Sequence, residues 1–310
     1  MSANNLFSVA GKNVLVTGSS RGIGLMIASG FASAGANVLI TSRDESALAK
    51  AAESIQQHLQ KSTVLNNSST SSSSSTSSTS KVHFVPSNVG SREGCKKLAE
   101  YTNELFGGKL DVLVNNAGAS WGEDPYDRES GKANWGWDKV LDLNVKGMFY
   151  LSRECVPMLE PKTKSDGDGG GDCYGGDSDN NNTDPGRIIN IGSIAGIISQ
   201  EAPTHAYDVS KAAVHHLTKK MAADLAKRQI TVNAIAPGYV PSRMSQGLEN
   251  YVGGDSSKIT GAIPLKRMGN EDDMAGAAIY LSSKAGSWTT GVILNVDGGA
   301  CTIQMPLASL

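Results

Sequence analysis

A short apolar segment that ends in a glycine-rich turn and leads into a helix-like pattern constrains the fold of this chain most strongly. Residues Asn13–Thr17 carry the strand signal, and the turn that follows spaces its glycines as G-x-x-x-G-x-G over Gly18, Gly22 and Gly24. A helical pattern then runs to Gly35. Such a unit brings the backbone close to phosphate groups and aims free helix N–H groups at them. The spacing is looser than the G-x-G-x-x-G fingerprint, and a glycine turn without a ligand is the alternative.

Strand-like and helix-like stretches alternate along the rest of the chain. This alternation predicts an α/β, single-domain Rossmann fold, a doubly wound parallel seven-stranded sheet with helices on both faces. Strands are expected at residues 12–17, 37–41, 82–86, 110–114, 187–192, 230–235 and 292–296. Ligands of such sheets bind beyond the carboxyl ends of the strands. The residues predicted at those ends, and therefore at one cleft, are Gly18, Asn88, Asn116, Ser193 and Pro237.

A tyrosine and a lysine stand four residues apart at Tyr207 and Lys211, inside a predicted helix. They would share one helix face, separated by about 6 Å of rise. A neighbouring ammonium favours the phenolate, so we expect the tyrosine pKa to fall from about 10 toward neutrality, as a general acid/base requires. Ser193 could hydrogen-bond a substrate carbonyl or alcohol. Taken alone, the pair could equally be a surface tyrosine and a solvated lysine.

Further motifs occur in order along the chain. They are Asn115-Asn116-Ala117-Gly118, Asn144, Gly192-Ser193, Pro237-Gly238 and Asp297-Gly298-Gly299. With the glycine turn and the tyrosine–lysine pair, they resemble the short-chain dehydrogenase/reductase family. The resemblance runs from about Leu6 to Ala300, interrupted by two insertions.

Three stretches support a narrower resemblance. Residues 115–122 (NNAGASWG), 189–197 (INIGSIAGI) and 235–244 (IAPGYVPSRM) are similar to the 3-oxoacyl reductases named for rhamnolipid biosynthesis, and more broadly to the 3-oxoacyl-[acyl-carrier-protein] reductases. The resemblance implies NADPH-dependent reduction of a 3-oxoacyl thioester to the 3-hydroxyacyl product. The alternatives are a reductase of another carbonyl compound (a polyketide intermediate, a diketone or a xenobiotic ketone) and, from a different class, a catalytically silent NADP-binding regulatory protein.

The resemblance also implies four catalytic residues. A ketone oxygen would lie between the hydroxyls of Ser193 and Tyr207, and Tyr207 would give its proton to the forming alkoxide. Lys211 would lower the tyrosine pKa and hold the nicotinamide ribose. Asn144 would fix a water that links Lys211 to solvent; a capping or kink residue in a helix is the alternative for this asparagine.

Charge at the end of the second predicted strand favours NADPH over NADH. An acid at this position selects NAD in the family, but here it is Ser42, followed by Arg43, with Arg21 inside the glycine turn. Two arginines suit a 2′-phosphate. The alternative is that Arg43 pairs with Asp44 or Glu45 on the surface.

One departure concerns Asn88, which stands where the family usually has an aspartate that accepts a hydrogen bond from adenine. An asparagine keeps a carbonyl acceptor without the charge, so we expect a weaker adenine contact. The predicted cofactor-binding residues are Gly18, Ser20, Arg21, Gly22, Ile23, Gly24, Arg43, Asn88, Val89, Asn116, Ala117, Gly118, Tyr207, Lys211, Pro237, Gly238 and Val240.

The predicted substrate residues frame the mouth of the cleft, together with a lid at about 240–262. They are Ser120, Trp121, Ser193, Tyr207 and Tyr239. Trp121 could equally be ordinary packing. Docking of a carrier protein would need exposed basic side chains near the mouth, and the candidates are Arg243, Lys258, Lys266 and Arg267.

Two low-complexity insertions, at about 62–80 and 162–186, interrupt a single NADP-binding domain that we expect over residues 1–310. The first contains a run of Ser and Thr only, and the second is rich in Gly, Asp and Asn. Neither can bury enough apolar surface to offset chain entropy, so we expect surface loops. The second lacks the ligands that a calcium loop needs at Gly170 and Asp177, and no metal site is predicted.

Composition excludes several classes of partner. The net charge of −2 and the short basic clusters leave no footprint for nucleic acid, and no apolar run is long enough to span a membrane. The four cysteines form no CxxC pair, and the N-terminus has no signal or transit pattern, so we expect a cytoplasmic protein. The family implies a homotetramer or homodimer through helices whose apolar outer positions would be Met148, Leu151, Val214 and Leu217, although a buried core gives the same pattern.

Overall fold

The computed structural model describes residues 3–67, 80–122, 124, 126, 133–161, 184–199, 202–242, 245 and 255–302. One sheet of seven parallel strands organises them, in the order β3-β2-β1-β4-β5-β6-β7. The strands are β1 (Asn13–Thr17), β2 (Asn37–Ser42), β3 (Val82–Pro86), β4 (Val112–Asn115), β5 (Gly186–Ile191), β6 (Ile230–Pro237) and β7 (Ile293–Val296). The predicted doubly wound sheet is confirmed, and each strand lies within two residues of its expected bounds.

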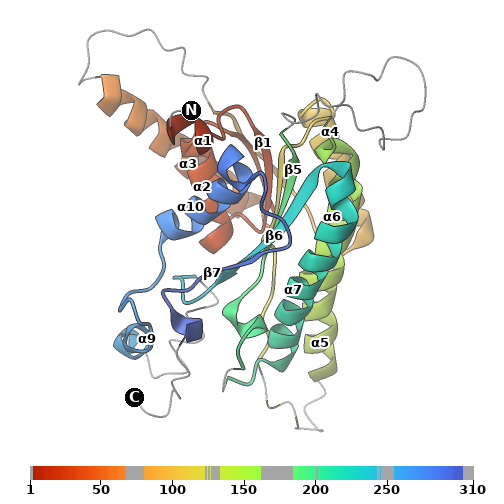
Figure 1. Cartoon of the computed structure of the whole chain (residues 1–310), viewed down its shortest axis with the longest axis vertical. Coiled ribbons are helices and arrows are strands. Elements are labelled where there is room, and N and C mark those ends of the chain that lie inside the picture. The colour runs from red at the N-terminus through yellow and green to blue at the C-terminus, as the bar shows by residue number, and fades with distance from the viewer. Residues whose placement is uncertain are drawn as a thin grey trace.

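Helices cover both faces of the sheet, as Figure 1 shows. One layer holds α1 (Ala3–Leu6), α2 (Gly22–Ser33), α3 (Glu45–Asn67) and α10 (Glu271–Ser282). The other holds α4 (Arg92–Leu105), α5 (Ala133–Leu141), the π-helix η1 (Asp142–Gly147), α6 (Met148–Leu159) and α7 (His205–Leu225). Shorter helices are η3 (Ile194–Gly196), η4 (Ala226–Arg228), α9 (Ser256–Ala262), η5 (Lys284–Gly286) and η6 (Ala300–Thr302). No helix in the described part of the chain is both long and apolar enough to cross a membrane.

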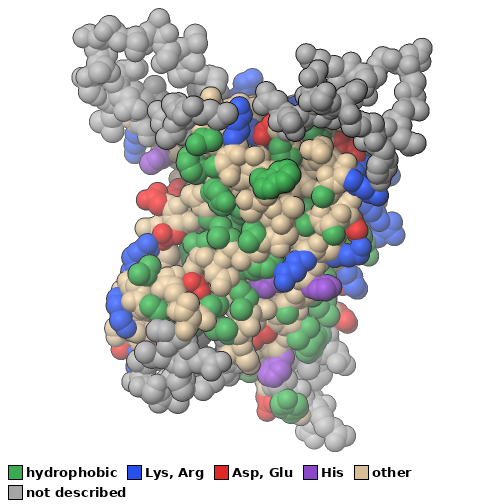
Figure 2. Space-filling model, in the orientation of Figure 1, with side chains coloured by type: hydrophobic (Ala, Val, Ile, Leu, Met, Phe, Trp, Pro, Cys, Tyr) green, Lys and Arg blue, Asp and Glu red, His purple; other side chains and the backbone are tan. Residues whose placement is uncertain are grey.

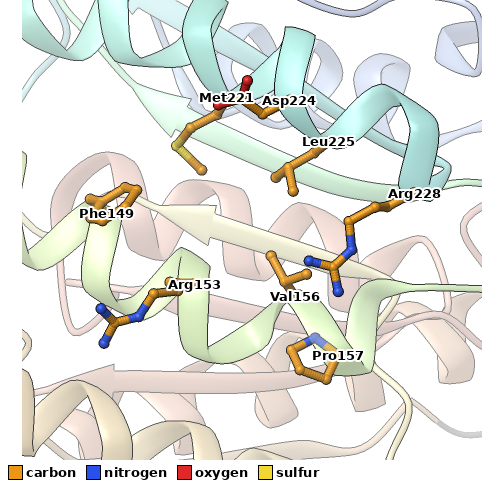
Figure 3. A pocket seen from close by; sticks show the side chains of 8 residues that line it. All are labelled: Phe149, Arg153, Val156, Pro157, Met221, Asp224, Leu225 and Arg228. Carbon is orange, nitrogen blue, oxygen red and sulfur yellow. The ribbon is translucent and has the colours of Figure 1, made fainter.

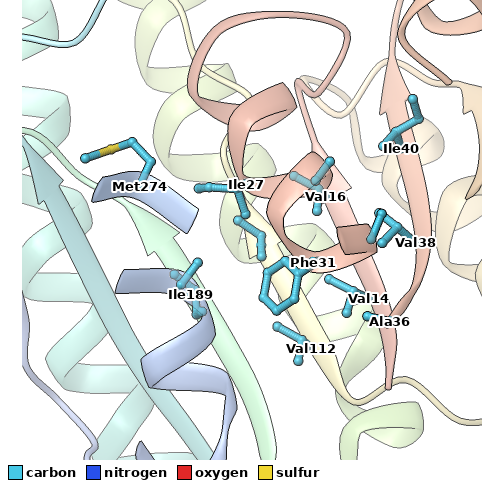
Figure 4. Packing of buried hydrophobic residues seen from close by; sticks show 14 of the residues in the cluster. Val14, Val16, Ile27, Phe31, Ala36, Val38, Ile40, Val112, Ile189 and Met274 are labelled. Carbon is cyan, nitrogen blue, oxygen red and sulfur yellow. The ribbon is translucent and has the colours of Figure 1, made fainter. Parts of the chain in front are cut away.

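Each face of the sheet has its own hydrophobic cluster. Val14 and Val16 of β1 point into the layer of α2, α3 and α10, where they join Phe31, while Leu15 points into the layer of α4, α6 and α7. Figure 4 shows the first of these clusters around Phe31. Alternate side chains of a strand point to opposite faces, and a sheet that is covered on both faces therefore requires apolar residues at every position. This is why the strands could be recognised as continuous apolar runs.

The strand order reverses direction between β1 and β4, because β2 and β3 lie on one side of β1 and the later strands on the other. A crevice forms at such a reversal, beyond the carboxyl ends of the strands, and it is the usual ligand site of this architecture. The glycine turn after β1 and the Asn115–Gly118 segment after β4 both lie at this point.

The insertions begin and end differently from the prediction. Helix α3 continues to Asn67, so the first residues of the predicted 62–80 insertion are helical, and Ser80 already donates to the Ala32 carbonyl at 2.7 Å. Residues 68–79 lie outside the described residues. The second insertion is shorter at its end, because Asp184 and Arg187 form an ion pair and β5 begins at Gly186. Residues 162–183 lie outside the described residues.

Candidate active site

The glycine turn is packed against the end of β4, which leaves no room for side chains. A Cβ atom on Gly18 would lie 2.8 Å from Cα of Ala117, and one on Gly24 would lie 2.4 Å from Nδ2 of Asn116. Gly18 also has φ of +64°, in the left-handed region. The turn therefore requires glycine at both positions, for close approach and for backbone conformation.

The N-terminus of α2 has no side-chain cap, unlike the N-termini of α4 and α10. Arg21 occupies its N-cap position without a side-chain cap hydrogen bond, whereas Ser91 caps α4 and Asn270 forms a capping box on α10. Uncapped N–H groups at a helix start, next to a turn of bare glycines, fit the pyrophosphate of a dinucleotide. The residues present therefore suit the predicted cofactor.

Hydrogen bonds from the end of β4 hold this turn in place. Nδ2 of Asn116 donates to the carbonyls of Thr17 and Gly18 at 2.8 and 3.0 Å. The hydroxyl of Thr17 accepts from the backbone N–H groups of Asn116 and Ala117, both at 3.0 Å. Thr17 was not among the predicted site residues, although its position directly before Gly18 is the signal that could have indicated it.

Ser19, a second residue that the sequence analysis missed, joins the turn to β2. Its hydroxyl donates to the Val16 carbonyl at 2.7 Å and accepts from the Thr41 N–H at 3.0 Å, and the side chain is fully buried. Nothing in the local sequence distinguishes Ser19 from Ser20 beside it, because only the packing of β1 on β2 decides which hydroxyl is buried.

The carboxylate nearest to Arg43 at the end of β2 is used within the chain. Asp44 accepts from the Ala47 N–H at 3.0 Å and from the Ser46 hydroxyl at 3.1 Å, so it caps the start of α3. These two hydrogen bonds lower the pKa of Asp44, with a smaller contribution from the positive charge of Arg21. The proposed alternative pairing of Arg43 with this carboxylate is not found among the described ion pairs, and both arginines are exposed.

Asn88 uses its side-chain oxygen within its own loop. Oδ1 accepts from the Gly90 N–H at 3.2 Å, which closes a local turn after β3. Val89 is buried and its carbonyl lies beside the thiol of Cys95, with 3.4 Å between sulfur and oxygen. The loop therefore takes its shape from bonds within the chain. Oδ1 of Asn88, the atom expected to accept a hydrogen bond from adenine, already accepts one from the backbone.

Ser193, Tyr207 and Lys211 come together as the sequence predicted. Ser193 follows the end of β5 by two residues and lies close enough to Tyr207 to influence the pKa of its phenol. Nζ of Lys211 lies 5.6 Å from the centroid of the Tyr207 ring. Ser193 and Lys211 are buried, with Lys211 only 5 % exposed, and Tyr207 is half-buried.

The expected effect of Lys211 on the tyrosine pKa is not found in the protein chain by itself. Burial raises the pKa of Tyr207, and the hydrogen bond from Ser193 only partly opposes it. Burial also lowers the pKa of Lys211 to about 8. The prediction that the phenol titrates near neutrality was therefore wrong for the isolated chain, because desolvation disfavours both charged forms.

Asn144 lies inside the π-helix η1, fully buried, with its side chain completely used by the protein. Oδ1 accepts from the Ala119 N–H at 2.8 Å, and Nδ2 donates to the Ala119 carbonyl and to the Ser210 hydroxyl, both at 2.9 Å. A π-helix is a local distortion that is frequent at functional sites. The side chain thus ties η1 to the β4 loop and to α7.

Ser210 completes this link and was also missed by the sequence analysis. It is fully buried between Tyr207 and Lys211 in the chain, and it donates to the Tyr207 carbonyl at 2.7 Å while accepting from Asn144. Its place in the tyrosine–lysine segment is the signal that could have indicated it.

The substrate side of the cleft is only partly described. The indole of Trp121 packs over Gly136 of α5, and a Cβ atom on that glycine would lie 2.3 Å from it. In this structure Trp121 is therefore a packing residue. Tyr239 is half-buried after β6, and Val240 is buried in the core, which leaves only its backbone for a cofactor. Ser120 is half-buried. Of the expected lid at 240–262, residues 243, 244 and 246–254 lie outside the described residues, and 256–262 form α9.

The fold and the site together define a class of protein. A doubly wound parallel sheet, this glycine turn, and a serine, a tyrosine and a lysine beyond β5 are the features of a dinucleotide-dependent oxidoreductase of the Rossmann type. Comparison with known proteins agrees. Residues 18–167 and 179–301 match the family model described as "Enoyl-(Acyl carrier protein) reductase". The chain belongs to the short-chain dehydrogenase/reductase family, whose members are oxidoreductases.

Individual relatives cover nearly the whole chain. The rhamnolipids biosynthesis 3-oxoacyl-[acyl-carrier-protein] reductase of Pseudomonas aeruginosa is 36% identical over 296 residues, covering 94% of this chain and 97% of the relative. The galactitol 2-dehydrogenase of Rhizobium johnstonii is 30% identical over 305 residues, covering 96% and 98%. The solved Pseudomonas aeruginosa RhlG/NADP active-site complex superimposes with a TM-score of 0.75 at 34% identity, covering 96% of this chain and 99% of that one.

Proposed function

We propose that this protein is an NADPH-dependent carbonyl reductase that reduces a 3-oxoacyl thioester to the 3-hydroxyacyl product. The observation that carries the proposal is the Lys211 ammonium 5.6 Å from the centroid of the Tyr207 ring, with Ser193 close enough to the phenol to oppose the rise of its pKa. The family membership and the 3-oxoacyl reductase relative support the substrate class. The intact set of catalytic side chains weighs against the regulatory alternative.

The proposed cofactor site runs along the carboxyl ends of the strands. The glycine turn and the open start of α2 would hold the pyrophosphate, and Arg21 and Arg43 would hold the 2′-phosphate. The loop at Asn88 and Val89 would hold adenine, while the backbone at Asn116–Gly118 and Pro237–Val240 would line the nicotinamide half. The solved relative with NADP supports this choice of cofactor.

In the proposed reaction, the chain's own groups bind the ketone and move one proton. When bound, NADPH supplies a hydride to the carbonyl carbon. The hydroxyls of Ser193 and Tyr207 would hold the carbonyl oxygen, and Tyr207 would donate its proton to the oxygen as negative charge develops there. A pKa raised by burial keeps this phenol protonated at neutral pH, as the reductive direction requires.

Lys211 would return the proton that Tyr207 gives away. Its pKa of about 8 places it where a lysine exchanges protons readily at neutral pH. Its ammonium already donates to the Ile191 carbonyl at 2.7 Å, which holds it beneath the phenol. The catalytic role of Asn144 would be to fix the shape of η1 and to offer a backbone carbonyl to a water on the path to solvent.

The test is NADPH consumption by the purified protein with acetoacetyl and longer 3-oxoacyl thioesters, on coenzyme A and on acyl carrier protein. Simple ketones, diketones and 5-keto sugars form the comparison panel, with NADH as control. Thioester turnover with kcat/KM above about 10⁴ M⁻¹s⁻¹ and a strong preference for NADPH supports the proposal. Tight NADPH binding without any turnover would favour the regulatory alternative.

A second candidate is a reductase of another small carbonyl compound. Relatives of almost equal coverage include the galactitol 2-dehydrogenase and a 5-keto-D-gluconate 5-reductase of Escherichia coli, 30% identical over 300 residues. The same catalytic residues would serve such a substrate, because they act on the carbonyl group that both kinds of substrate share. Turnover of a keto sugar while thioesters are ignored would decide for this candidate.

Docking of a carrier protein has less support than the chemistry. Figure 2 shows basic side chains at the left edge of this view, over α9 and the segment that leads to α10. Two of the predicted basic residues are engaged within the chain. Nζ of Lys266 donates to the Gly261 carbonyl at 2.6 Å, and Arg267 pairs with both oxygens of Asp273. Lys258 is exposed, and Arg243 lies outside the described residues.

We also propose that a second copy packs on the outer face of α6 and α7. Met148, Leu151 and Val214 are buried in this chain's own core, which is the alternative that the sequence left open, and Leu217 is half-buried against the same core. The outer face instead carries Phe149, 39 % exposed, beside a groove of about 190 Å³. Figure 3 shows the groove, lined by Phe149, Arg153, Val156, Pro157, Met221, Asp224, Leu225 and Arg228.

The molar mass in solution tests this assembly. Light scattering should give the molar mass of a homodimer or homotetramer, and a Phe149→Glu variant should shift that mass toward the monomer.

We also propose a cytoplasmic location. The free thiols of the described cysteines, Cys95, Cys155 and Cys301, support it.

A further inference from the structure

A line of buried polar side chains crosses the sheet beneath the candidate active site. Asn115 and Asn190 are register partners on β4 and β5. Nδ2 of Asn115 donates to the Ser152 hydroxyl of α6 at 2.9 Å and to Oδ1 of Asn190 at 3.0 Å. Nδ2 of Asn190 in turn donates to the Thr218 hydroxyl of α7 at 2.9 Å. All four side chains are at most 3 % exposed, so these hydrogen bonds are made in the protein interior.

The chain itself fixes the direction of the hydrogen bond between Asn190 and Thr218. The single hydroxyl proton of Thr218 goes to the Val214 carbonyl of its own helix at 2.8 Å, so only lone pairs face Asn190. Oδ1 of Asn190 accepts from Asn115, and turning this amide over would bring two N–H donors together. Asn190 therefore reaches α7 as a donor, and Thr218 is the acceptor that it requires.

Ser210 meets Asn144 in the same way, eight residues and about 12 Å nearer the start of α7 than Thr218. Its proton goes to the Tyr207 carbonyl at 2.7 Å, and its lone pair accepts from the Asn144 amide at 2.9 Å. Helix α7 is therefore docked on two amide groups, one from η1 and one from β5. Two contacts at different heights hold a helix against sliding and tilting, whereas one contact would leave it free to pivot.

The contact of Asn190 and Thr218 joins the two elements that carry the catalytic hydroxyls. Asn190 lies in β5, three residues before Ser193, whereas Thr218 shares α7 with Tyr207. The height of the phenol relative to the serine hydroxyl therefore depends on how α7 is seated on β5. Alignment of this kind matters for turnover, because a misplacement of about 1 Å can lower a rate about 100-fold.

We propose that Thr218 is a positioning residue that, as the acceptor for Asn190, fixes α7 along β5. The phenol of Tyr207 is thereby held level with the hydroxyl of Ser193. This role rests on the proposed function of those two residues. A threonine that only filled the core would be replaceable by valine, which has nearly the same shape, without an effect on turnover.

Thr102 of α4 provides a matched control inside the same chain. It is fully buried like Thr218, and its hydroxyl also donates to a carbonyl of its own helix, that of Leu98 at 2.7 Å. Among the described residues, no side chain of another element donates to it. The two threonines therefore differ in the one contact that the inference concerns.

The kinetic test compares the two threonines. Thr218→Val leaves the buried Asn190 amide without its acceptor, whereas Thr102→Val leaves no donor unpaired. With the best ketone substrate, Thr218→Val should lose about tenfold or more in kcat, with the KM for NADPH unchanged within about threefold. Thr102→Val should stay within about twofold of wild type in both quantities. Thr218→Ser should recover most of the loss, because it restores the hydroxyl.

Hydrogen exchange supplies a readout that needs no substrate. Amide hydrogens of residues 205–218 should exchange at least about tenfold faster in Thr218→Val, while those of α2 on the opposite face of the sheet keep their wild-type rates. Ser210→Ala removes the other docking contact and should give the same pattern, which keeps the test decisive if Thr218→Val does not fold.

Two results overturn the inference: equal kcat in Thr218→Val and Thr102→Val, or wild-type exchange in α7 of the Thr218 and Ser210 variants. Faster exchange confined to α7 supports the docking role of Thr218 even where wild type reduces no ketone. Failure of the proposed function is thereby distinguished from failure of this inference.

Discussion

The Nζ atom of Lys211 donates to the backbone carbonyl of Ile191 at 2.7 Å, two residues before Ser193. The helix that carries the lysine is thereby tied to the strand that carries the serine. Burial of this ammonium destabilises the folded protein. It lowers the pKa of Lys211 to about 8, whereas the lysine of the unfolded chain titrates near 10.4.

We expect Lys211→Met to lower kcat at least about 100-fold while raising the free energy of unfolding at pH 7 by about 1 to 3 kcal/mol, since it removes a buried ammonium. The lysine has a depressed pKa in the folded state. The penalty for burying the ammonium is therefore fully present below pH about 8 and disappears as the pH rises to about 10.4, where the lysine is neutral in both states.

Urea unfolding of both proteins at pH 7, 8, 9 and 10 measures this effect. The advantage of the variant should shrink as the pH rises above 8. A difference in free energy that stays constant across this range would contradict the assigned pKa.

Replacing Tyr207 by phenylalanine should remove the proton donor and leave the cofactor site intact. We expect kcat to fall by about 10³-fold or more, with NADPH affinity unchanged within about threefold. Fluorescence titration with NADPH and a steady-state assay measure the two quantities. The matched control is Tyr280→Phe on α10, which should behave as wild type. The hydroxyl of Tyr280 lies 3.3 Å from the hydroxyl of Thr289. Substantial turnover by Tyr207→Phe would exclude the proposed proton transfer.

Removing the arginines beside β2 should weaken NADPH and spare NADH. Arg21→Ala or Arg43→Ala should each raise the KM for NADPH about 10- to 100-fold, since a hydrogen bond to a charged group contributes about 1.5 to 3 kcal/mol. The KM for NADH should stay within about twofold. Lys97→Ala removes an exposed charge on α4 and serves as control. Parallel losses for both cofactors would show that the arginines do not bind the 2′-phosphate.

Asp184 should stabilise the fold without affecting catalysis, because it neutralises charge at the amino end of the sheet. It pairs at 2.7 Å with Arg187, which is 1 % exposed, and also bonds Lys12. Asp184→Asn should lower the free energy of unfolding by about 2 kcal/mol, less than for a fully buried pair because Asp184 is 39 % exposed. Initial-rate kcat at 25 °C should be unchanged.

The pH dependence of this effect follows from the lowered pKa of Asp184, to which its hydrogen bond with Lys12 and the charge of Arg187 contribute. A carboxylate with a depressed folded pKa contributes stability above pH ~3.9, and the contribution is lost as pH falls through its folded pKa. The difference between wild type and Asp184→Asn should therefore be present at pH 6 and shrink toward pH 3. Glu93→Gln, which breaks an exposed pair with Lys97, should show no such difference.

Asn144 shows where sequence patterns stop being informative. Its motif placed it correctly beside the cleft, but the pattern could not indicate a π-helix, because the extra residue in that turn is stabilised by Ala119 and Ser210 from other parts of the chain. The same holds for Ser19, whose hydroxyl accepts from the N–H of Thr41 on the neighbouring strand. Residues of this kind carry no local signal, since their partners are distant in sequence.

The sequence by itself determined the seven strands, their alternation with helices, the glycine turn and the spacing of Tyr207 and Lys211. These features follow from local chemistry, because apolar runs, glycine and helical periodicity act over a few neighbouring residues. The tertiary structure alone decided the direction in which the Tyr207 pKa shifts, the use of Asp44 as a helix cap, and the burial of Met148 and Val214. Spacing along a helix sets how far apart two groups are, but the surrounding packing sets how much water reaches them, and it is the loss of water that governs their charge.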